Sequence, residues 1–399
     1  MEQPLDLTTP DSIQGNWNYP TTIRMGGGRL AELPFVCKSL GIRNPLLVID
    51  AGLVEQPFVA RAMEFVKAEG ANIALFSEVK PNPSGANIAA GVEAYKTGNH
   101  DGVIALGGGS ALDAGKAIAL MSGQTHSLWD LEDVGTNWLR ADPDGIAPIV
   151  AVPTTSGTGS EVGRASVILD EEQKVKRIIF HPKMMPQVVL ADPELVTGLP
   201  AHLTAATGLD AFVHCLEAYC APGYHPMADG IALEGMRLIK EWLVPAVEDG
   251  NNLTARSHMM VASSMGATAF QKGLGGVHAL AHPLGALFDA HHGLLNAILL
   301  PYVLMRNRMA IESRIEHVAA CLGLEDSTFD GFMAWIIDLR QRLDIPHSLA
   351  EIGITAECSE LVGDMAALDP SAGGNPIPLT AEDYGILCST AVAGIGFVA

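Results

Sequence analysis

Four of the 13 histidines in this chain of 399 residues lie within fifteen positions, at His278, His282, His291 and His292. His278 and His282 are four residues apart, so on a helix their side chains share one face. Their neighbours are almost all apolar residues or glycine, which offer a buried imidazole few hydrogen-bond partners. This stretch alone allows two interpretations: ordinary histidines paired with backbone carbonyls, or a group of metal ligands.

A second stretch, from Thr207 to Tyr219, carries another pair of ligand-type side chains at helical spacing. Asp210 and His214 are four residues apart and share a face, and Pro200 stands near the expected start of the helix. One carboxylate and one imidazole from this helix, with two or three imidazoles from the first stretch, would form a divalent-metal site. Such ligands suit Fe(II), Zn(II), Ni(II) or Mn(II) and do not choose among these metals.

These residues need a scaffold, and the first half of the chain predicts an α/β domain. Strands are expected at 45–50, 71–76, 102–106, 149–153 and 187–192, and helices at 56–70, 84–97 and 111–121. Strands that are apolar throughout and alternate with helices predict a parallel sheet covered on both faces.

After Pro200 the pattern changes, and helical periodicity dominates the rest of the chain. Helices are expected at 227–244, 252–270, 303–321, 332–343 and 383–393. We therefore expect two domains, an α/β domain over 1–197 and a helical domain over 198–399.

A glycine turn follows the third expected strand and opens the next helix, with the residues Gly107, Gly108, Gly109 and Ser110. Glycines let a backbone approach a ligand closely, and the N–H groups at a helix start attract phosphate. The spacing matches neither a Walker A loop nor Gly-x-Gly-x-x-Gly, so a simple tight turn remains an alternative. Asp50, at the end of an earlier strand, favours a nucleotide. A carboxylate there accepts the ribose hydroxyls and repels a 2′-phosphate, which favours NAD over NADP.

Two further loops carry polar groups that can contact the same ligand. The loop from Pro153 to Val162 contains Thr154, Thr155 and Thr158, whose hydroxyl and N–H groups can hold a pyrophosphate or a ribose. A capped turn is the alternative interpretation. Asn82 lies between two prolines in a stiff loop, where it either reaches the cofactor or only shapes the turn.

The composition excludes several classes of function. The formal net charge of −21 argues against nonspecific binding to nucleic acid or to an anionic membrane surface. No apolar run reaches the length of a bilayer, and the N-terminus lacks the pattern of a signal peptide. The six cysteines are scattered and form no Cys-x-x-Cys pair, which favours a cytoplasmic location over a disulfide framework.

In combination, these motifs resemble the iron-containing, or group III, alcohol dehydrogenase family, whose members include lactaldehyde reductase and 1,3-propanediol dehydrogenase. The resemblance extends from the strand that ends at Asp50 to at least Tyr302. It rests on five motifs: Pro-Asn82-Pro; Gly-Gly-Gly-Ser110-x-x-Asp113-x-x-Lys116; Pro-Thr154-Thr155-x-Gly-Thr158; Ala-Ala-Thr-Gly-x-Asp210-x-x-x-His214; and His278-x-x-x-His282-Pro-Leu-Gly followed by His292-Gly.

The resemblance implies a dinucleotide-binding α/β domain, an all-α domain and a metal site in the cleft between them, as in dehydroquinate synthase-like folds. It implies the metal ligands Asp210, His214, His278 and His292. It makes His282 a catalytic proton relay outside the metal shell, and it gives His291 no role. The implied cofactor-binding residues are Asp50, Asn82, Gly107, Gly108, Gly109, Ser110, Asp113, Thr154, Thr155, Thr158 and Lys176. A homodimer or higher homo-oligomer is also implied.

The implied activity is reversible, NAD(H)-linked hydride transfer between a small alcohol and its aldehyde or ketone. The implied metal is Fe²⁺, with Zn²⁺, Ni²⁺ or Mn²⁺ as alternatives, and it would lower the pKa of the alcohol oxygen.

Other functions remain open. Related enzymes of the glycerol dehydrogenase, dehydroquinate synthase or maleylacetate reductase type are alternatives, although Asp210 beside three histidines favours the iron branch. No dense basic pocket for a dicarboxylate is evident. A metallohydrolase without a nucleotide would leave Asp50 and the glycine turn without a role. A non-catalytic metal- or nucleotide-binding protein is a further alternative, which any turnover would exclude.

Two departures from the family pattern prevent transfer of a relative's substrate. Val162 is followed by Gly163 and Arg164, where the family often has a hydroxyl residue, and the segment from Phe270 to His278 is one residue shorter than in lactaldehyde reductase. A cation at Arg164 would favour a substrate with an acidic group. The ordinary alternative is an ion pair with one of the 45 acidic residues of the chain.

Overall fold

The computed structural model describes residues 15–17 and 21–395. Backbone contacts divide the chain into two compact units, with the division between Gly198 and Leu199. The first unit is built on a sheet and the second from helices, and each has its own hydrophobic core.

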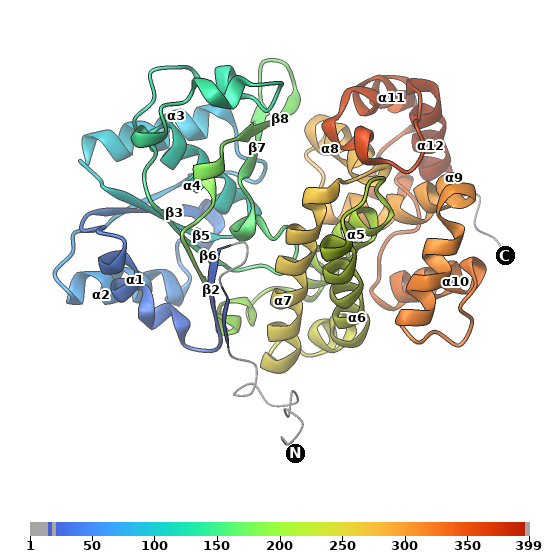
Figure 1. The fold of residues 1–399 in the computed structure, drawn as a ribbon, viewed down its shortest axis with the longest axis horizontal. Coiled ribbons are helices and arrows are strands. Elements are labelled where there is room, and N and C mark those ends of the chain that lie inside the picture. Colours follow the sequence, from blue (N-terminus) through green and yellow to red (C-terminus); the bar gives the residue numbers. More distant parts are fainter. Residues whose placement is uncertain (1–14, 18–20, 396–399) are drawn as a thin grey trace. The chain divides into compact units, whose positions relative to one another are not determined.

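The sheet of the first unit has the strand order β1-β2-β9-β6-β5-β3-β4. Figure 1 labels β2, β3, β5 and β6 among these strands. Its strands are β1 (Gly15–Trp17), β2 (Thr22–Met25), β3 (Pro45–Asp50), β4 (Ala74–Val79), β5 (Gly102–Gly107), β6 (Ile149–Pro153) and β9 (Val188–Ala191). Only β1 pairs antiparallel with its neighbour, and the other six strands are parallel. The predicted parallel sheet is therefore confirmed.

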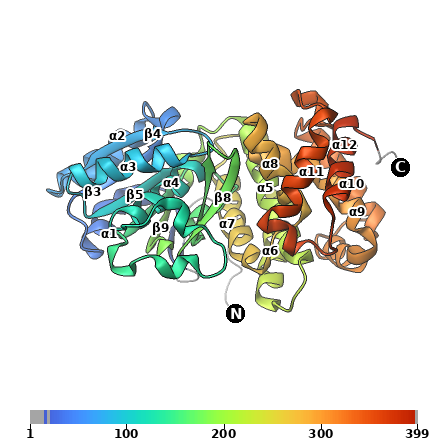
Figure 2. The same ribbon diagram turned by 90° about the horizontal axis from the view of Figure 1, so that it is seen from above.

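Alternate residues of the central strands enter two separate cores. In β3, Leu46 and Val48 pack with α3 (Gly85–Thr97) and α4 (Gly109–Met121), whereas Leu47 and Ile49 pack with α1 (Leu33–Ser39) and α2 (Pro57–Ala68). Successive side chains of a strand point to opposite faces, so a strand covered by helices on both faces is apolar throughout. Figure 2 shows these helices and strands from above.

One strand differs in position from its prediction. The sequence predicts it at 71–76, and the structure places β4 at Ala74–Val79. The preceding residues form a connection in which the Asn72 N–H donates to the Arg43 carbonyl (3.1 Å). β4 lies at the edge of the sheet, where the polar residues Ser77 and Glu78 are tolerated, and a search for apolar runs overlooks them.

The first unit also contains an antiparallel hairpin that the sequence does not predict. It consists of β7 (Ala165–Asp170) and β8 (Val175–Phe180), with Lys174 at φ 54° in the connection. The burial of β7 alternates along the strand, as expected when one face is covered. The hairpin follows the threonine-rich loop directly, so it fixes the far end of that loop.

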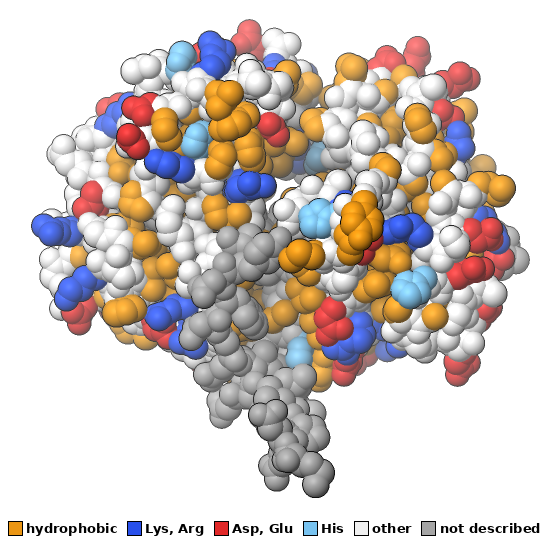
Figure 3. All heavy atoms as spheres, viewed as in Figure 1, with side chains coloured by type: hydrophobic (Ala, Val, Ile, Leu, Met, Phe, Trp, Pro, Cys, Tyr) orange, Lys and Arg blue, Asp and Glu red, His pale blue; other side chains and the backbone are white. Residues whose placement is uncertain are grey.

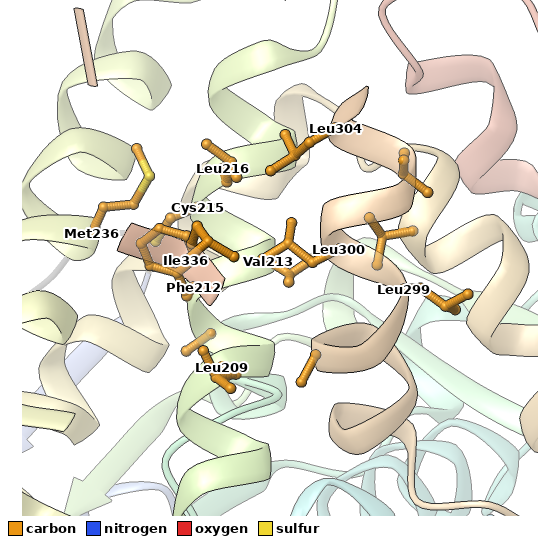
Figure 4. Close-up of a cluster of buried hydrophobic side chains, with 14 of the residues drawn as sticks. Leu209, Phe212, Val213, Cys215, Leu216, Met236, Leu299, Leu300, Leu304 and Ile336 are labelled. Carbon is orange, nitrogen blue, oxygen red and sulfur yellow. The ribbon is translucent and has the colours of Figure 1, made fainter. Parts of the chain in front are cut away.

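The second unit consists of helices packed around α5. The helices are α5 (Ala201–Cys220), α6 (Pro226–Glu248), α7 (Leu253–Ala269), α8 (Gly276–Phe288), α9 (His292–Cys321), α10 (Phe329–Arg342), α11 (Ser359–Leu368) and α12 (Ala381–Ala393). Every residue of α5 from Gly208 to Cys220 is buried. Figure 4 shows its apolar side chains, including Leu209, Phe212 and Leu216, facing residues of α6, α9 and α10.

The helix predicted at 303–321 begins eleven residues earlier in the structure, at His292. Its first turns, from Leu295 to Leu304, are buried on all sides, so this part of the sequence lacks the polar face that marks a surface helix. Pro301 lies inside the helix, although a proline in a sequence usually indicates that a helix is interrupted. The early start places His292 on the first turn of α9.

The surface carries both signs of charge despite the acidic composition. Figure 3 shows acidic and basic side chains interspersed over the described part of one face. Among the described residues, no helix combines the length and apolar character needed to cross a bilayer.

Helices α11 and α12 approach each other at Gly363, which gives a stability prediction. A Cβ atom on Gly363 would lie 2.4 Å from the carbonyl oxygen of Ala381 and 2.8 Å from the backbone nitrogen of Gly385. We expect Gly363→Ala to lower the free energy of unfolding by about 1–3 kcal/mol, the usual cost of overpacking. Chemical denaturation would measure this change.

Gly230→Ala is the matched control, because Gly230 lies inside α6 with nothing within 4 Å of its would-be Cβ. This variant should be neutral or more stable by up to about 1 kcal/mol, since alanine favours a helix over glycine. Equal destabilisation of the two variants would contradict the packing explanation.

Candidate active site

Helix α5 positions two of the candidate ligands in the centre of the second unit. The helix begins after Pro200, its N-terminal cap, and carries Asp210 and His214 on one face. Both side chains are about 4% exposed. A buried carboxylate is costly unless it is paired, so this part of the core must supply partners.

Helix α8 supplies the next imidazole. It begins at Gly276, directly after Gly275, and carries His278 and His282 one turn apart. The ring of His278 stacks on that of His214, with centroids 4.8 Å apart and an angle of 19°. Pro283 lies inside α8 immediately after His282.

Helix α9 supplies the last ligand, from its first residue. His292 follows the cap residue His291, whose Nδ1 accepts a hydrogen bond from the Leu294 N–H (3.3 Å). The ring of His292 lies 5.2 Å from that of His278 and stacks on that of His282 at 5.4 Å.

The structure brings Asp210, His214, His278 and His292 together. One ligand atom from each lies within 4.8 Å of all the others. The Nε2 atoms of His214, His278 and His292 lie 3.7, 3.8 and 3.7 Å from Asp210 Oδ1. A four-coordinate ion with bonds of about 2.1 Å would separate its ligands by about 3.4 Å. The spacing and the donor chemistry therefore fit a divalent metal ion such as iron or zinc.

Asn296 supports this fit, because its amide group faces three of the four ligand residues. It lies one turn after His292 on α9, and its Nδ2 donates to Asp210 Oδ1 (2.7 Å). The same nitrogen lies 3.1 Å from His278 Nε2 and 3.2 Å from His292 Nε2. The lone pairs of three side chains thus converge on one small region, which is what a cation requires.

Two buried carboxylates contact the Nδ1 nitrogens of the two histidines on α8. Glu217 Oε2 lies 2.6 Å from His278 Nδ1, and Asp369 Oδ2 lies 2.8 Å from His282 Nδ1. Burial is the largest influence on the pKa of His278 and lowers it. The hydrogen bond and charge of Glu217, with the charge of Asp210, outweigh burial and leave that pKa raised.

The pKa of Asp369 shifts in the opposite direction, downward. Burial is again the largest influence and raises its pKa, but the His282 contact and hydrogen bonds from Ser371 leave it lowered. Asp369 is therefore an ionised acceptor for the Nδ1–H of His282. With Nδ1 engaged by Asp369, Nε2 is the second hydrogen-bonding nitrogen of the His282 ring.

In the first unit, the candidate cofactor residues follow the carboxyl ends of neighbouring parallel strands. Asp50 ends β3, Gly107 ends β5 and Thr154 follows β6. The chain passes from β3 to β4 on one side and then to β5 on the other, so the strand order reverses between β3 and β5. Ligands of open α/β sheets bind at such a reversal.

The glycine turn and the threonine-rich loop lie in contact. The Thr154 N–H donates to the Gly107 carbonyl (2.9 Å), and a Cβ on Gly109 would lie 2.6 Å from Thr158 Oγ1. A Cβ on Gly107, which has φ +151°, would lie 2.4 Å from Asp50 Oδ2. Only glycine fits at this position. The side chain of Thr155 approaches Gly108 in the same way, with its Cγ2 3.3 Å from the would-be Cβ.

Asp50 touches the start of α4. Its Oδ2 accepts a hydrogen bond from the Gly108 N–H (3.0 Å). Burial raises its pKa, and the hydrogen bonds from Gly108 and Ala111 partly offset this effect. The side chain is half-buried, so one edge remains available to a ligand.

Asp113 lies in a buried network instead of at the surface. Its carboxylate accepts hydrogen bonds from Ser160 Oγ (2.5 Å) and the Val167 N–H (2.8 Å), and Lys116 Nζ lies 3.2 Å away. Lys116 also donates to the carbonyls of Ser160 and Ala165. This pair ties α4 to the threonine-rich loop and to β7.

The remaining predicted residues occupy partly open positions. Asn82 has φ 53° in the loop after β4, and Ser110 is half-buried in the first turn of α4. Lys176 lies on β8. Arg164 is exposed, and its guanidinium lies over the ring of Phe180 at 5.6 Å.

Three residues that contact the candidate site, Glu217, Asn296 and Asp369, were not predicted from the sequence. Glu217 was detectable in part, because it follows Asp210 by seven residues and His214 by three on one helix face. Asn296 follows His292 by one helical turn, which is a weaker signal. Asp369 lies 87 residues beyond its partner His282, and no local pattern connects them.

Family models match both units of the chain. The model described as iron-containing alcohol dehydrogenase matches residues 20–193. The model described as the C-terminal part of the Fe-containing alcohol dehydrogenase family matches residues 204–392.

Individual relatives match over nearly the whole chain. The 4-hydroxybutyrate dehydrogenase of Cupriavidus necator is 39% identical over 92% of this chain and 97% of its own length. A crystal structure of a 1,3-propanediol oxidoreductase superposes with a TM-score of 0.88 at 34% identity, over 92% of this chain and 97% of that chain. The NAD⁺ complex of sulfoacetaldehyde reductase from Bifidobacterium kashiwanohense has a TM-score of 0.83 at 28% identity, over 95% and 98%.

The ligand geometry predicts the effect of removing one imidazole. We expect His292→Ala to weaken zinc or iron binding by more than about 100-fold. Removal of a residue that only hydrogen-bonds to a metal ligand costs about 10- to 100-fold in affinity, and loss of the ligand itself should cost more. Equilibrium dialysis followed by metal analysis would measure this change without an activity assay.

His291→Ala is the matched control, because His291 is the neighbouring residue and caps α9. It should cost about 1 kcal/mol of stability through loss of the cap and leave metal affinity intact. Undiminished metal binding in His292→Ala would exclude His292 as a ligand.

Proposed function

The chain belongs to the iron-containing alcohol dehydrogenase family, and we propose that it catalyses reversible, NAD(H)-dependent hydride transfer between a small alcohol and its aldehyde or ketone. The observation that carries this proposal is the convergence of Asp210, His214, His278 and His292. We assign metal binding to these four residues in the second unit and NAD binding to the first unit.

The first unit supports NAD as the cofactor. The glycine turn, the threonine-rich loop and Asp50 lie together at the carboxyl edge of the parallel sheet, where the strand order reverses. The related sulfoacetaldehyde reductase has been crystallised with NAD⁺. We assign the pyrophosphate to the Gly107–Ser110 turn with Thr154, Thr155 and Thr158, and the adenosine ribose to Asp50. Asn82 and Lys176 are proposed to contact the cofactor, whereas Asp113 positions the threonine-rich loop.

The bound metal would supply a Lewis acid for the substrate oxygen, and NAD would supply the hydride acceptor. The four side chains are held in place because each comes from a helix segment that is largely buried. Such preorganisation limits the reorganisation needed during the reaction.

His282 is the proposed proton carrier. It is not one of the four clustered ligands, and its Nδ1 is bonded to Asp369. Nε2 is therefore the atom that accepts the alcohol proton during oxidation and returns it during reduction. Asp369 fixes the ring orientation and stabilises the positive charge of protonated His282.

The substrate class is a small alcohol. The names of the three relatives include 4-hydroxybutyrate, 1,3-propanediol and sulfoacetaldehyde, so members of this family differ in the group remote from the reacting carbon. Two of these molecules carry an acidic group. The exposed guanidinium of Arg164, which follows the threonine-rich loop, supports a substrate of that kind as the second candidate.

We also propose a cytoplasmic location and a homodimer or higher homo-oligomer. All six cysteines are free thiols, which suits a reducing compartment. Size-exclusion chromatography with light scattering would determine the number of subunits.

An assay after anaerobic reconstitution tests the proposed activity. Metal-free protein would be loaded separately with Fe(II), Zn(II), Ni(II) or Mn(II) and assayed with a panel of alcohols and aldehydes. We expect NAD(H) to be preferred over NADP(H). Asp50→Asn should shift this preference toward NADP(H) by about tenfold, or about 1.4 kcal/mol, because it removes the negative charge and keeps an acceptor for Gly108.

Metal-dependent hydrolysis without nucleotide binding would contradict the proposal. A preference for NADPH in the unaltered protein would contradict the role of Asp50.

If His282 carries the proton and does not bind the metal, its removal should slow the reaction without releasing the metal. His282→Ala should retain metal and lower kcat by about 100-fold or more, the usual contribution of a positioned acid–base group. Parallel measurements of metal content, kcat and the pH dependence of kcat would test this. A His282→Ala protein that no longer holds metal would show that His282 is a ligand.

A further inference from the structure

Glu217 lies beside the metal-ligand cluster and has a role that the proposed function does not yet include. It is on α5, three residues after His214 and seven after Asp210, so the three side chains share one face of the helix. Its side chain is 8% exposed. A carboxylate buried this deeply must be matched by hydrogen-bond donors.

The structure supplies three donors, and all come from the start of α8. Glu217 Oε2 accepts from the Gly275 N–H (2.9 Å) and lies 2.6 Å from His278 Nδ1. Glu217 Oε1 accepts from the Val277 N–H (2.7 Å). The N-terminus of a helix presents unpaired N–H groups and a partial positive charge, so a carboxylate is favoured there.

The carboxylate of Glu217 lies close to the backbone of Gly275. A Cβ on Gly275 would lie 2.9 Å from Glu217 Oε1, closer than real Cβ contacts allow. The absence of that atom lets the backbone N–H of Gly275 reach the carboxylate directly.

The contact with His278 determines which nitrogen faces the ligand cluster. When Nδ1 donates its proton to Glu217, Nε2 is left with a lone pair, and Nε2 is the atom near Asp210 Oδ1. Only an unprotonated nitrogen binds a metal ion. A carboxylate behind a histidine ligand also fixes its ring orientation and makes it a stronger base.

We propose that Glu217 is a positioning residue for the metal: it holds His278 in the tautomer and orientation that bind the ion, and so sets the metal affinity. This inference rests on the proposed function, since it concerns the same site. It predicts that Glu217 acts through His278 and not only through the stability of the fold.

The effect of Glu217 on the metal can be distinguished from a purely structural role, because a second residue, Asn375, also caps α8. Asn375 Oδ1 accepts from the Gly276 N–H (3.0 Å) and from Asn307 Nδ2 (2.8 Å). Asn375 therefore holds the same helix start as Glu217. Its hydrogen bonds reach Gly276, Asn307 and Ile377, and none of these is a candidate metal ligand.

The decisive comparison is between Glu217→Gln and Asn375→Ala. Glutamine keeps the size of the side chain but has only one acceptor oxygen for three donors. If its NH₂ group faces His278 Nδ1, the ring must carry its proton on Nε2, which blocks the metal-binding atom. Glu217→Asp is a second variant, which keeps the charge but is one methylene too short to reach α8.

Each purified protein would be stripped of metal and titrated with Zn²⁺ in competition with a chromogenic chelator. It would then be loaded with Co²⁺ for visible absorption spectroscopy. Glu217→Gln should bind Zn²⁺ about 10- to 100-fold more weakly than the unaltered protein and show an altered cobalt spectrum. Asn375→Ala should unfold at a lower temperature but keep the affinity and the spectrum.

Three results would overturn the inference. Unchanged affinity and spectrum in folded Glu217→Gln would show that the carboxylate does not act on the metal. Equal losses in Glu217→Gln and Asn375→Ala would reduce its role to holding α8 in place. If Glu217→Gln does not fold, unchanged affinity in Glu217→Asp would have the same meaning as the first result. Failure of the unaltered protein to bind Zn²⁺ or Fe²⁺ would instead overturn the proposed function itself.

Discussion

The burial of acidic side chains on α5 is the constraint on which the helical unit depends. Asp210 and Glu217 lie within a helix whose apolar residues form the core of that unit, where an unpaired carboxylate would cost several kcal/mol. Both are compensated by groups from other helices: the Asn296 amide and nearby imidazoles for Asp210, and the start of α8 for Glu217. The positions of α8 and α9 next to α5 are thus specified by polar contacts as well as by apolar packing, and the same contacts collect the imidazoles.

In the first unit, the candidate cofactor-binding residues are brought together by backbone packing. Parallel pairing places the ends of β3, β5 and β6 at one edge, and Gly107 and Gly109 remove the atoms that would keep Asp50 and Thr158 apart. Close backbone approach creates this candidate site, whereas the cluster of candidate metal ligands in the other unit comes from charge compensation in a core. One chain therefore combines two physical solutions, each suited to its ligand. A dinucleotide needs backbone N–H groups and space, and a cation needs converging lone pairs.

Much of this could be predicted from the sequence, because the signals were local. The parallel sheet followed from apolar runs such as Pro45–Asp50, and the pairs Asp210/His214 and His278/His282 followed from helical spacing. The hairpin β7–β8 and the early start of α9 were missed, since their patterns depend on which surfaces are buried by distant elements. Asp369 could not be predicted at all. Its contact with His282 spans 87 residues, and nothing near either residue signals the other.

That long-range contact has a consequence for the synthesis of the protein. The candidate site of the helical unit draws on α5, α8 and α9, but the partner of His282 and the second cap of α8 come from the segment containing Asp369 and Asn375. A chain still on the ribosome has made the four clustered side chains well before this segment emerges. Its histidine helix then lacks two of its fixed contacts. Translation therefore produces the four clustered residues before the segment that holds α8. A chain truncated before residue 369 would contain all four of them but would lack the partner of His282 and the second cap of α8.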